Sequence, residues 1–289
     1  VNPLRGQNNV QGAADMGCQP HQGAGYFPVA DEKHQEFYTE KYGVTHPTKP
    51  GLKIPQMFEA AINKELKGLW IIGEDIVQTD PNSAHVIEAM NSLELLVVQE
   101  IFMSETAKLA TVVLPGTTFL EKDGTFTNTE RRIQRVNRAV PPLPGTKPDG
   151  LIVTEMMQKL GFDQPTYDAD QVLAEIADIV PFFKGVTRER LGKFGLQWPV
   201  QEDGTDTKIL HTETFKLGKG RLKNFDWKES SEIEANQKDY PLILTTSRVL
   251  QHYNAATMTR RTKNINIVDE DVLLIHPKDA EYRDLNTGD

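Results

Sequence analysis

Cysteine is almost absent from this sequence, which has 289 residues and a single thiol, Cys18. One cysteine excludes a disulfide framework and a zinc site built from the chain's own thiolates. It also excludes an iron–sulfur cluster ligated by this chain alone. Because scarce thiols are typical of proteins in a reducing compartment, we expect a cytoplasmic location.

Positive charge is also in short supply, since 32 Lys and Arg stand against 41 Asp and Glu and give a net charge of −9. Without a dense basic stripe, the sequence argues against a nucleic-acid partner. No apolar run approaches the length of about 18 residues that a membrane span needs, so we expect no membrane span. The seven histidines lack spacings such as H-E-x-x-H, and we expect no metal ligand from this chain.

The overall composition is that of a globular protein, with 38% hydrophobic and 25% charged residues. Such a chain can bury a sizeable core, and its length fits one large domain or two ordinary ones. The chain begins at Val1 rather than at a methionine and stops at the turn-like pair Gly288-Asp289. We therefore expect it to be part of a longer protein.

Strand-like and helix-like segments alternate between residues 54 and 114. Apolar residues recur at helical spacing over 54–66, and a further helix is expected after Asp80, the candidate N-cap. Short uninterrupted apolar runs, typical of buried strands, cover 69–72, 95–98 and 111–114. Short connections between such elements predict an α/β fold in which helices cover a parallel sheet.

The pattern changes farther along the chain. Helices are expected at 149–160 and 172–176, and residues 190–239, rich in glycine and charge, are interpreted as an inter-domain segment. Strand-like runs return at 241–246, 265–267 and 272–275. We therefore expect an α/β domain over 1–189, an inter-domain excursion over 190–239 and a strand-rich domain over 240–289.

Residues 5–12 combine one cation, four carboxamides and two glycines. Glycines allow close backbone approach, and Arg5 can hold a carboxylate through two parallel hydrogen bonds. Composition alone favours a simpler interpretation, a polar surface turn.

A second polar group follows the strands of the predicted sheet. The loop 73–80 lies at the carboxyl end of the first strand, and Gln99 and Gly116 end the next two. Ligands of open α/β sheets bind at this edge, so a nucleotide-like ligand is expected, although no G-x-G-x-x-G or Walker sequence is present. Helix capping would account for Asp80 but leaves Asp75 without a role.

Two later stretches, 123–135 and 246–261, mix hydroxyls, amides and cations. Such groups suit phosphate or pterin contacts. For any single arginine, a solvated ion pair in an acidic protein is the better interpretation, and His252 alone is more often a structural histidine than a ligand.

These strings, in this order, resemble the large (alpha) subunit of molybdenum- or tungsten-dependent formate dehydrogenases, in the bis-molybdopterin guanine dinucleotide oxidoreductase superfamily. The resemblance covers essentially the whole chain. The Arg5 string and residues 196–199 favour the formate branch over nitrate or sulfoxide reductases. The matching strings are 1–12 with 15–17, 73–75 with 78–80, 98–103, 124–132, 195–199, and 252–254 with 257–261.

The resemblance implies a Rossmann-like molybdopterin-binding domain over 1–189 and, over 240–289, the truncated start of a β-barrel domain of the aspartate-decarboxylase type that binds the dinucleotide. It implies that Arg5 binds the formate carboxylate beside the metal and that Gln7 lies near the substrate channel. Positions matching one guanosine-phosphate arm are Asp75, Thr79, Gln99, Gly116 and Asp149. Positions matching pterin contacts are Arg248, Val249, His252 and Asn254.

The family's metal ligand, a cysteine or selenocysteine, and its iron–sulfur cysteines would lie upstream of Val1. Cys18 follows Arg5 and the 15–17 string, so it does not match that ligand. The resemblance thus implies a molybdenum or tungsten bis-molybdopterin guanine dinucleotide, with 4Fe-4S clusters in the upstream part or in partner subunits. Implied partners are formate and CO2, the rest of the large subunit, and iron–sulfur electron-transfer subunits of a hydrogenase or an NAD-reducing module.

Three hypotheses remain open from the sequence. The first is a segment of a formate dehydrogenase, in which formate is oxidised at the metal–pterin centre and the electrons leave through iron–sulfur clusters. The second is a related oxidoreductase of another small oxyanion, such as a nitrate reductase. The third is a non-catalytic relative that acts as a scaffold in a redox complex.

Overall fold

The computed structural model of the chain describes residues 5–215 and 217–289. Residues 1–4, where the first family-like string begins, and Lys216 lie outside the described residues. The chain divides into two compact units, residues 1–220 and 221–289. Within the described ranges, no helix is long and apolar enough to cross a membrane.

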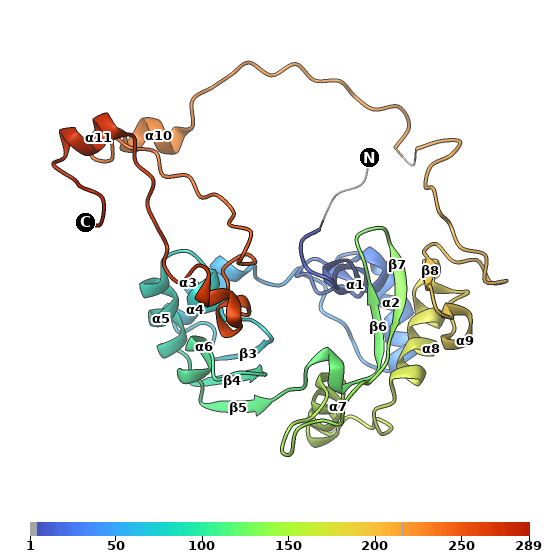
Figure 1. The fold of residues 1–289 in the computed structure, drawn as a ribbon. Helices are drawn as coiled ribbons and strands as arrows, with labels where there is room; N and C mark the ends of the chain where they lie inside the picture. Colours follow the sequence, from blue (N-terminus) through green and yellow to red (C-terminus); the bar gives the residue numbers. More distant parts are fainter. Residues whose placement is uncertain (1–4, 216) are drawn as a thin grey trace. The chain divides into compact units, whose positions relative to one another are not determined.

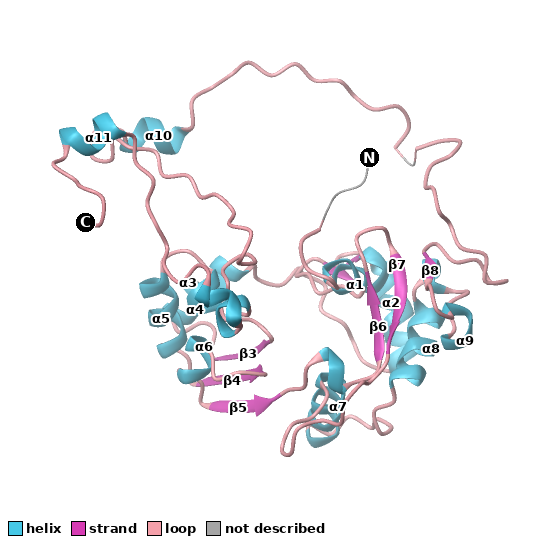
Figure 2. Cartoon of the chain, viewed as in Figure 1, coloured by secondary structure: helices cyan, strands magenta, loops and turns pink. Residues whose placement is uncertain are grey.

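A parallel sheet forms in the first unit, as predicted. The strands β3 (Gly68–Ile72), β4 (Leu95–Glu100) and β5 (Val112–Pro115) pair in that order, with Ile71 opposite Val98 and Val98 opposite Val113. The helices that accompany them are α3 (Ile54–Ile62), α4 (Ile76–Thr79), α5 (Ser83–Asn91) and α6 (Glu105–Lys108). The α/β class is therefore confirmed (Figure 2).

A hydrophobic core joins this sheet to its helices. Phe58 of α3, Val86 of α5 and Leu96 of β4 are buried in one cluster. The apolar runs in the sequence are continuous rather than alternating because strands of a covered parallel sheet bury side chains on both faces. This core fixes the strand ends that carry the polar residues discussed below.

The start of α5 differs from the expectation. Its N-cap is Asn82, in the left-handed region at φ 60°, with Oδ1 accepting from the amide of His85 at 3.5 Å. Asp80 instead ends α4, where its own amide donates to the carbonyl of Ile76 at 3.1 Å. Asparagine tolerates the left-handed conformation better than most residues and caps as well as aspartate, so the helix begins two residues later.

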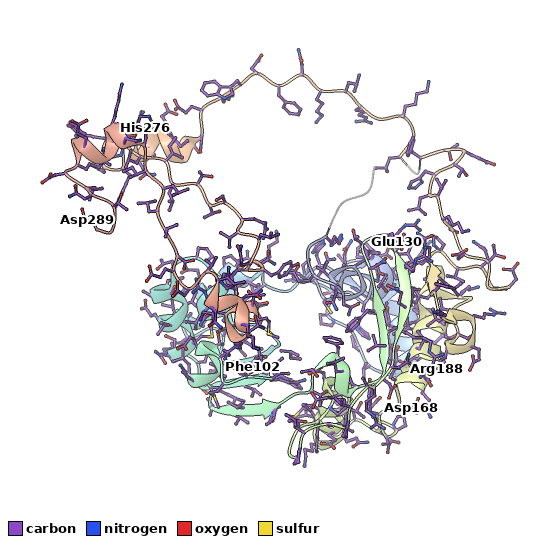
Figure 3. The ribbon with its side chains drawn as sticks, in the orientation of Figure 1. Phe102, Glu130, Asp168, Arg188, His276 and Asp289 are labelled. Carbon is purple, nitrogen blue, oxygen red and sulfur yellow. The ribbon has the colours of Figure 1, made fainter. Side chains whose placement is uncertain are left out.

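An antiparallel hairpin forms where the sequence analysis assigned no strands. The strands β6 (Gly124–Thr127) and β7 (Arg132–Val136) pair directly, and β8 (Leu196–Gln197) adds to β7. Glu130 lies in the connection between β6 and β7 (Figure 3). Polar side chains hide the strand pattern here, since only Ile133 of β7 is fully buried.

A second core lies beneath this hairpin, where Ile133, Leu173 and Val180 are buried in one cluster. The helices α2 (Glu32–Tyr42) and α8 (Ala169–Ile179) are labelled in Figure 1. They are joined by a hydrogen bond from the Tyr42 hydroxyl to Glu175 at 2.7 Å and by an ion pair between Lys41 and Asp178. The remaining elements of the unit are α1 (Val10–Asp15), β1 (Gln22–Gly23), η1 (Ala24–Tyr26), β2 (Phe27–Pro28), η2 (Phe119–Glu121), α7 (Asp149–Lys159), η3 (Pro181–Phe183) and α9 (Arg188–Leu191).

The second unit does not show the expected strands. Its elements are α10 (Ser231–Asn236), η4 (Thr259–Arg261), η5 (Lys263–Asn266) and α11 (Pro277–Tyr282), and its described residues contain no strand. The strands expected at 241–246, 265–267 and 272–275 are therefore absent there, and Leu244 is 77% exposed. A strand needs hydrogen-bonded neighbours and a surface to bury its apolar face. The start of a β-barrel is thus not confirmed by the structure.

Candidate functional site

Asp75 follows β3, at the carboxyl edge of the parallel sheet. The chain turns there at Gly73, whose φ of 64° suits glycine. The Asp75 side chain is buried, and its Oδ1 accepts from the amide of Thr106 at 2.9 Å and from the hydroxyl of Thr106 at 2.7 Å. The carboxylate is therefore held by α6 through one oxygen only.

Gln99, Gly116 and Asp149 converge at the same edge. Gln99 of β4 is 1% exposed, and its Nε2 donates to Asp149 Oδ1 at 2.7 Å. A Cβ on Gly116 would lie 3.1 Å from the same Asp149 oxygen, so glycine permits this close approach. The other oxygen of Asp149 pairs with Lys122. The structure thus brings together three residues that the sequence analysis had assigned to one ligand.

Buried polar atoms without partners gather where β3, β4 and β5 end. Asp75 Oδ2, Gln99 Oε1 and Thr117 Oγ1 find no hydrogen-bond partner in the described part of the chain. Leaving such a group unpaired typically costs about 1–3 kcal/mol. A guanosine brings donors, namely the base N1–H, the exocyclic amine and the ribose hydroxyls. These residues therefore fit a guanosine-containing group.

Other residues at this edge behave differently. Thr79, the last residue of α4, is exposed, and its hydroxyl donates to Glu74 at 2.7 Å rather than to Asp75, Gln99 or Asp149. Sequence reasoning missed Thr106, which positions Asp75, and Lys122, which pairs with Asp149. The sequence contains one sign that Lys122 belongs to the site, namely its position directly before the polar stretch 123–135.

Arg5 and Gln7 are exposed residues before α1. The amide of Arg5 donates to Thr129 Oγ1 at 3.2 Å, and Asn9 Oδ1 accepts from the amide of Thr127 at 2.9 Å. The polar stretch 5–12 therefore contacts the β6–β7 hairpin, which is formed by the polar stretch 123–135.

A fully buried carboxylate, Asp15, supports this region. It accepts from Gln11 at 2.8 Å, from the Tyr26 hydroxyl at 2.6 Å and from Trp198 Nε1 at 2.9 Å. Burial raises the pKa of Asp15, while these hydrogen bonds and the positive charge of Arg5 oppose that rise. The Asp15 carboxylate is thus held by three side-chain donors.

Of the hairpin arginines, Arg132 fits the simpler interpretation of an ion pair, and Arg131 does not. Arg132 Nε forms an ion pair with Glu130 at 2.6 Å. Arg131 donates to the carbonyl oxygens of Trp198 and of Thr207, and its guanidinium lies 5.4 Å from the centre of the Trp198 ring. Arg131 therefore ties the β6–β7 connection to the segment that follows β8.

The pterin-matching residues lie in the second unit. His252 has both ring nitrogens engaged, with Thr259 Oγ1 at 3.0 Å and the Val268 carbonyl at 2.7 Å. Arg248 donates to Asn254 Oδ1 at 2.5 Å, and Val249 is 47% exposed. The structure brings Arg248 and Asn254 together and gives His252 a structural role in this unit.

Comparisons with known families match both parts of the chain. Residues 4–159 match the family described as molybdopterin oxidoreductase, and residues 242–289 match the molybdopterin dinucleotide binding domain.

Known relatives match over nearly the full chain. The F420-dependent formate dehydrogenase subunit alpha of Methanocaldococcus jannaschii is 43% identical over 100% of this chain and 43% of its own length. F420-dependent formate dehydrogenase 1 subunit alpha of Methanococcus maripaludis is 43% identical over 97% of this chain and 42% of its own length. The chain therefore spans less than half the length of these relatives.

A solved structure shares the fold. Acetylene hydratase from Pelobacter acetylenicus superimposes with a TM-score of 0.54 and 20% sequence identity, covering 90% of this chain and 38% of the other. At this identity the likeness concerns the fold alone.

Proposed function

The chain belongs to the molybdopterin oxidoreductase family, and on that premise we propose that it is the middle and late part of a formate dehydrogenase large subunit. The complete enzyme would interconvert formate and CO2 with transfer of two electrons. The names of relatives that are 43% identical support this proposal. So do the Arg5 string and residues 196–199.

The observation that carries the proposal is the set of unpaired buried polar atoms at the sheet edge. Asp75 and Gln99 would hold the guanine edge of one cofactor arm, and Gly116 would let that arm approach the backbone. Asp149 would orient Gln99 through their 2.7 Å hydrogen bond. The bound metal and pterin would supply the redox chemistry, while these residues supply binding and orientation.

Arg5 would bind the substrate. Its guanidinium is exposed, and its backbone is tied to Thr129. A planar guanidinium can grip both oxygens of formate and so fix the direction of the C–H bond. Turnover of formate against nitrate by the complete enzyme tests this assignment, and metal analysis of the same preparation tests the scaffold hypothesis.

The electron route is proposed on the same basis. Iron–sulfur clusters in the upstream part or in partner subunits would accept the electrons and pass them to a hydrogenase or an NAD-reducing module. The F420 dependence named for the two relatives adds F420 to these candidate acceptors.

The 289-residue segment on its own is expected to be inactive and to lose metal. Its one thiol is the exposed Cys18, and within the described residues no three His, Cys, Asp or Glu side chains group as a metal site. Metal analysis after reconstitution and desalting checks this, with the complete subunit as control. Stoichiometric metal on the segment alone would contradict the prediction.

Asp75→Asn is expected to weaken cofactor loading about tenfold or more, since hydrogen bonds to a charged group contribute about 1.5–3 kcal/mol. The substitution keeps an oxygen for Thr106 and replaces only the unpaired Oδ2 by an amino group, a donor where an acceptor is needed. The measurement is metal and released guanine nucleotide per subunit at limiting cofactor.

Asp80→Asn, at the opposite end of α4, is the matched control and should load normally. Specific activity per bound metal should be unchanged in both variants. Normal loading of Asp75→Asn combined with a collapse of activity per metal would show that Asp75 has a different role.

A further inference from the structure

The first unit contains a small cavity that is lined by none of the residues proposed above to bind substrate or cofactor. Its volume is about 210 Å³, and it is bounded by the segment 20–29, by α2 and by the segment 46–51. Pro20, Val29, Tyr38 and Pro47 supply apolar walls. The amide of Gly51 donates to the carbonyl of Pro20 at 2.7 Å and closes the segment over the cavity.

Two imidazoles face this cavity without partners. His34 is 9% exposed, and the Nε2 atoms of His34 and His46 are buried with no hydrogen-bond partner among residues 5–215 and 217–289. The neighbouring polar groups are already engaged. Tyr38 donates its hydroxyl to the Ala24 carbonyl at 3.3 Å, and Gln35 donates its amide to the Val29 carbonyl at 2.8 Å.

The His34 ring is fixed in this position. It stacks on Phe27 with a centroid distance of 4.1 Å and meets Tyr38 edge-on at 4.4 Å. Tyr38 in turn faces His46 at 5.1 Å. Because Tyr38 packs against both rings, neither imidazole can turn to find another partner without disturbing the aromatic cluster.

Gly23 leaves space in front of His34. A Cβ at this position would lie 3.7 Å from His34 Nε2 and 3.9 Å from Tyr38 Cε2, which are ordinary contact distances. A methyl group there would therefore be tolerated by the fold but would occupy the space beside the unpaired nitrogen.

The charge of the lining selects the kind of ligand. Lys49 and the two imidazoles line the cavity, and no aspartate or glutamate does so within the described residues. Burial lowers the pKa of His34 and His46 adds to the effect, while Asp31, which caps α2, opposes it. Neutral imidazoles can donate N–H hydrogen bonds to oxygen.

We propose that this cavity binds a small carboxylate with an apolar body. Its oxygens accept from His34 and His46, Lys49 supplies the opposite charge, and its body packs between Pro20, Val29 and Tyr38. The site goes beyond the formate chemistry proposed above and does not depend on it.

Calorimetric titration of the complete subunit with benzoate tests this site. One benzoate per chain is expected to bind, and His34→Gln, His46→Gln and Gly23→Ala should each weaken binding about tenfold or more, as expected for loss of a charged hydrogen bond or of ligand space. His21→Gln, an exposed histidine outside the lining, and Gly220→Ala, at a glycine in open space, should bind as the unaltered protein does.

Benzamide, the uncharged counterpart of benzoate, should bind about tenfold or more weakly. Comparable binding of benzamide, or benzoate binding that survives Gly23→Ala, would overturn the proposal. Absence of benzoate binding at about 10 mM would overturn it too. If a histidine variant fails to fold, Gly23→Ala still tests the site, because its added methyl group makes only ordinary contacts within the protein.

Discussion

Replacing Arg5 by lysine in the complete enzyme is expected to lower kcat/KM for formate by on the order of 100-fold per bound metal. Lysine keeps the charge but loses the planar two-point grip on a carboxylate. A carboxylate held at one point is misoriented, so kcat should fall and KM should rise. Steady-state kinetics on Arg5→Lys and Arg5→Ala, normalised to metal content, measure the effect.

Arg135→Lys is the matched control for that experiment. Its guanidinium donates to Asn137 at 3.1 Å on the hairpin surface, and its kinetics should stay unchanged. Metal content should be normal in all these variants, because Arg5 is assigned to the substrate and not to the cofactor arm. Unchanged normalised kcat/KM in both Arg5 variants would reduce Arg5 to a structural residue of a polar turn.

Leu96→Ala is expected to destabilise the parallel sheet by about 2–5 kcal/mol, the usual range for truncating a buried leucine. Leu96 is 2% exposed in the core shared by α3, α5 and β4. Hydrogen exchange of the β4 amides in the complete subunit reports the local opening free energy. Exchange should accelerate about 30-fold or more.

Leu95→Ala serves as a control on the same strand. Leu95 is 46% exposed, and its truncation should change exchange of the β4 amides far less. Equal acceleration in the two variants would contradict the prediction, because it would mean that the buried Leu96 contributes no more to the stability of the sheet than the exposed Leu95.

The parallel sheet could be predicted from sequence because its strands are continuous apolar runs separated by short connections. The hairpin β6–β7 could not, since Thr125, Thr127 and Arg135 mask its period, and only Ile133 is buried in β7. In the second unit the error is the reverse, because strands were predicted where the structure has none. Its apolar runs have the composition of strands, but pairing depends on neighbours that lie far away in sequence.

For the candidate site, the convergence of Gln99 and Gly116 followed from the parallel order of β4 and β5, since Gln99 lies next to the last residue of β4 and Gly116 directly follows β5. The assignment of Asp149 and Gln99 to one ligand came from the resemblance and not from periodicity, and their direct hydrogen bond was found only in the structure. The pairing of Lys122 with Asp149 depends on the path of the loop between β5 and β6, which no local pattern fixes.

The donors of Asp15 have a consequence for how the protein is made. Gln11 is synthesised just before Asp15 and Tyr26 soon after it, but Trp198 follows 183 residues later. At about 5–20 residues per second, this interval lasts roughly 10–40 s. Until then the carboxylate lacks its third donor, although β3, β4 and β5 are already complete by Pro115. We expect the segment carrying Arg5 to settle late in synthesis, when the nascent chain already holds a folded sheet.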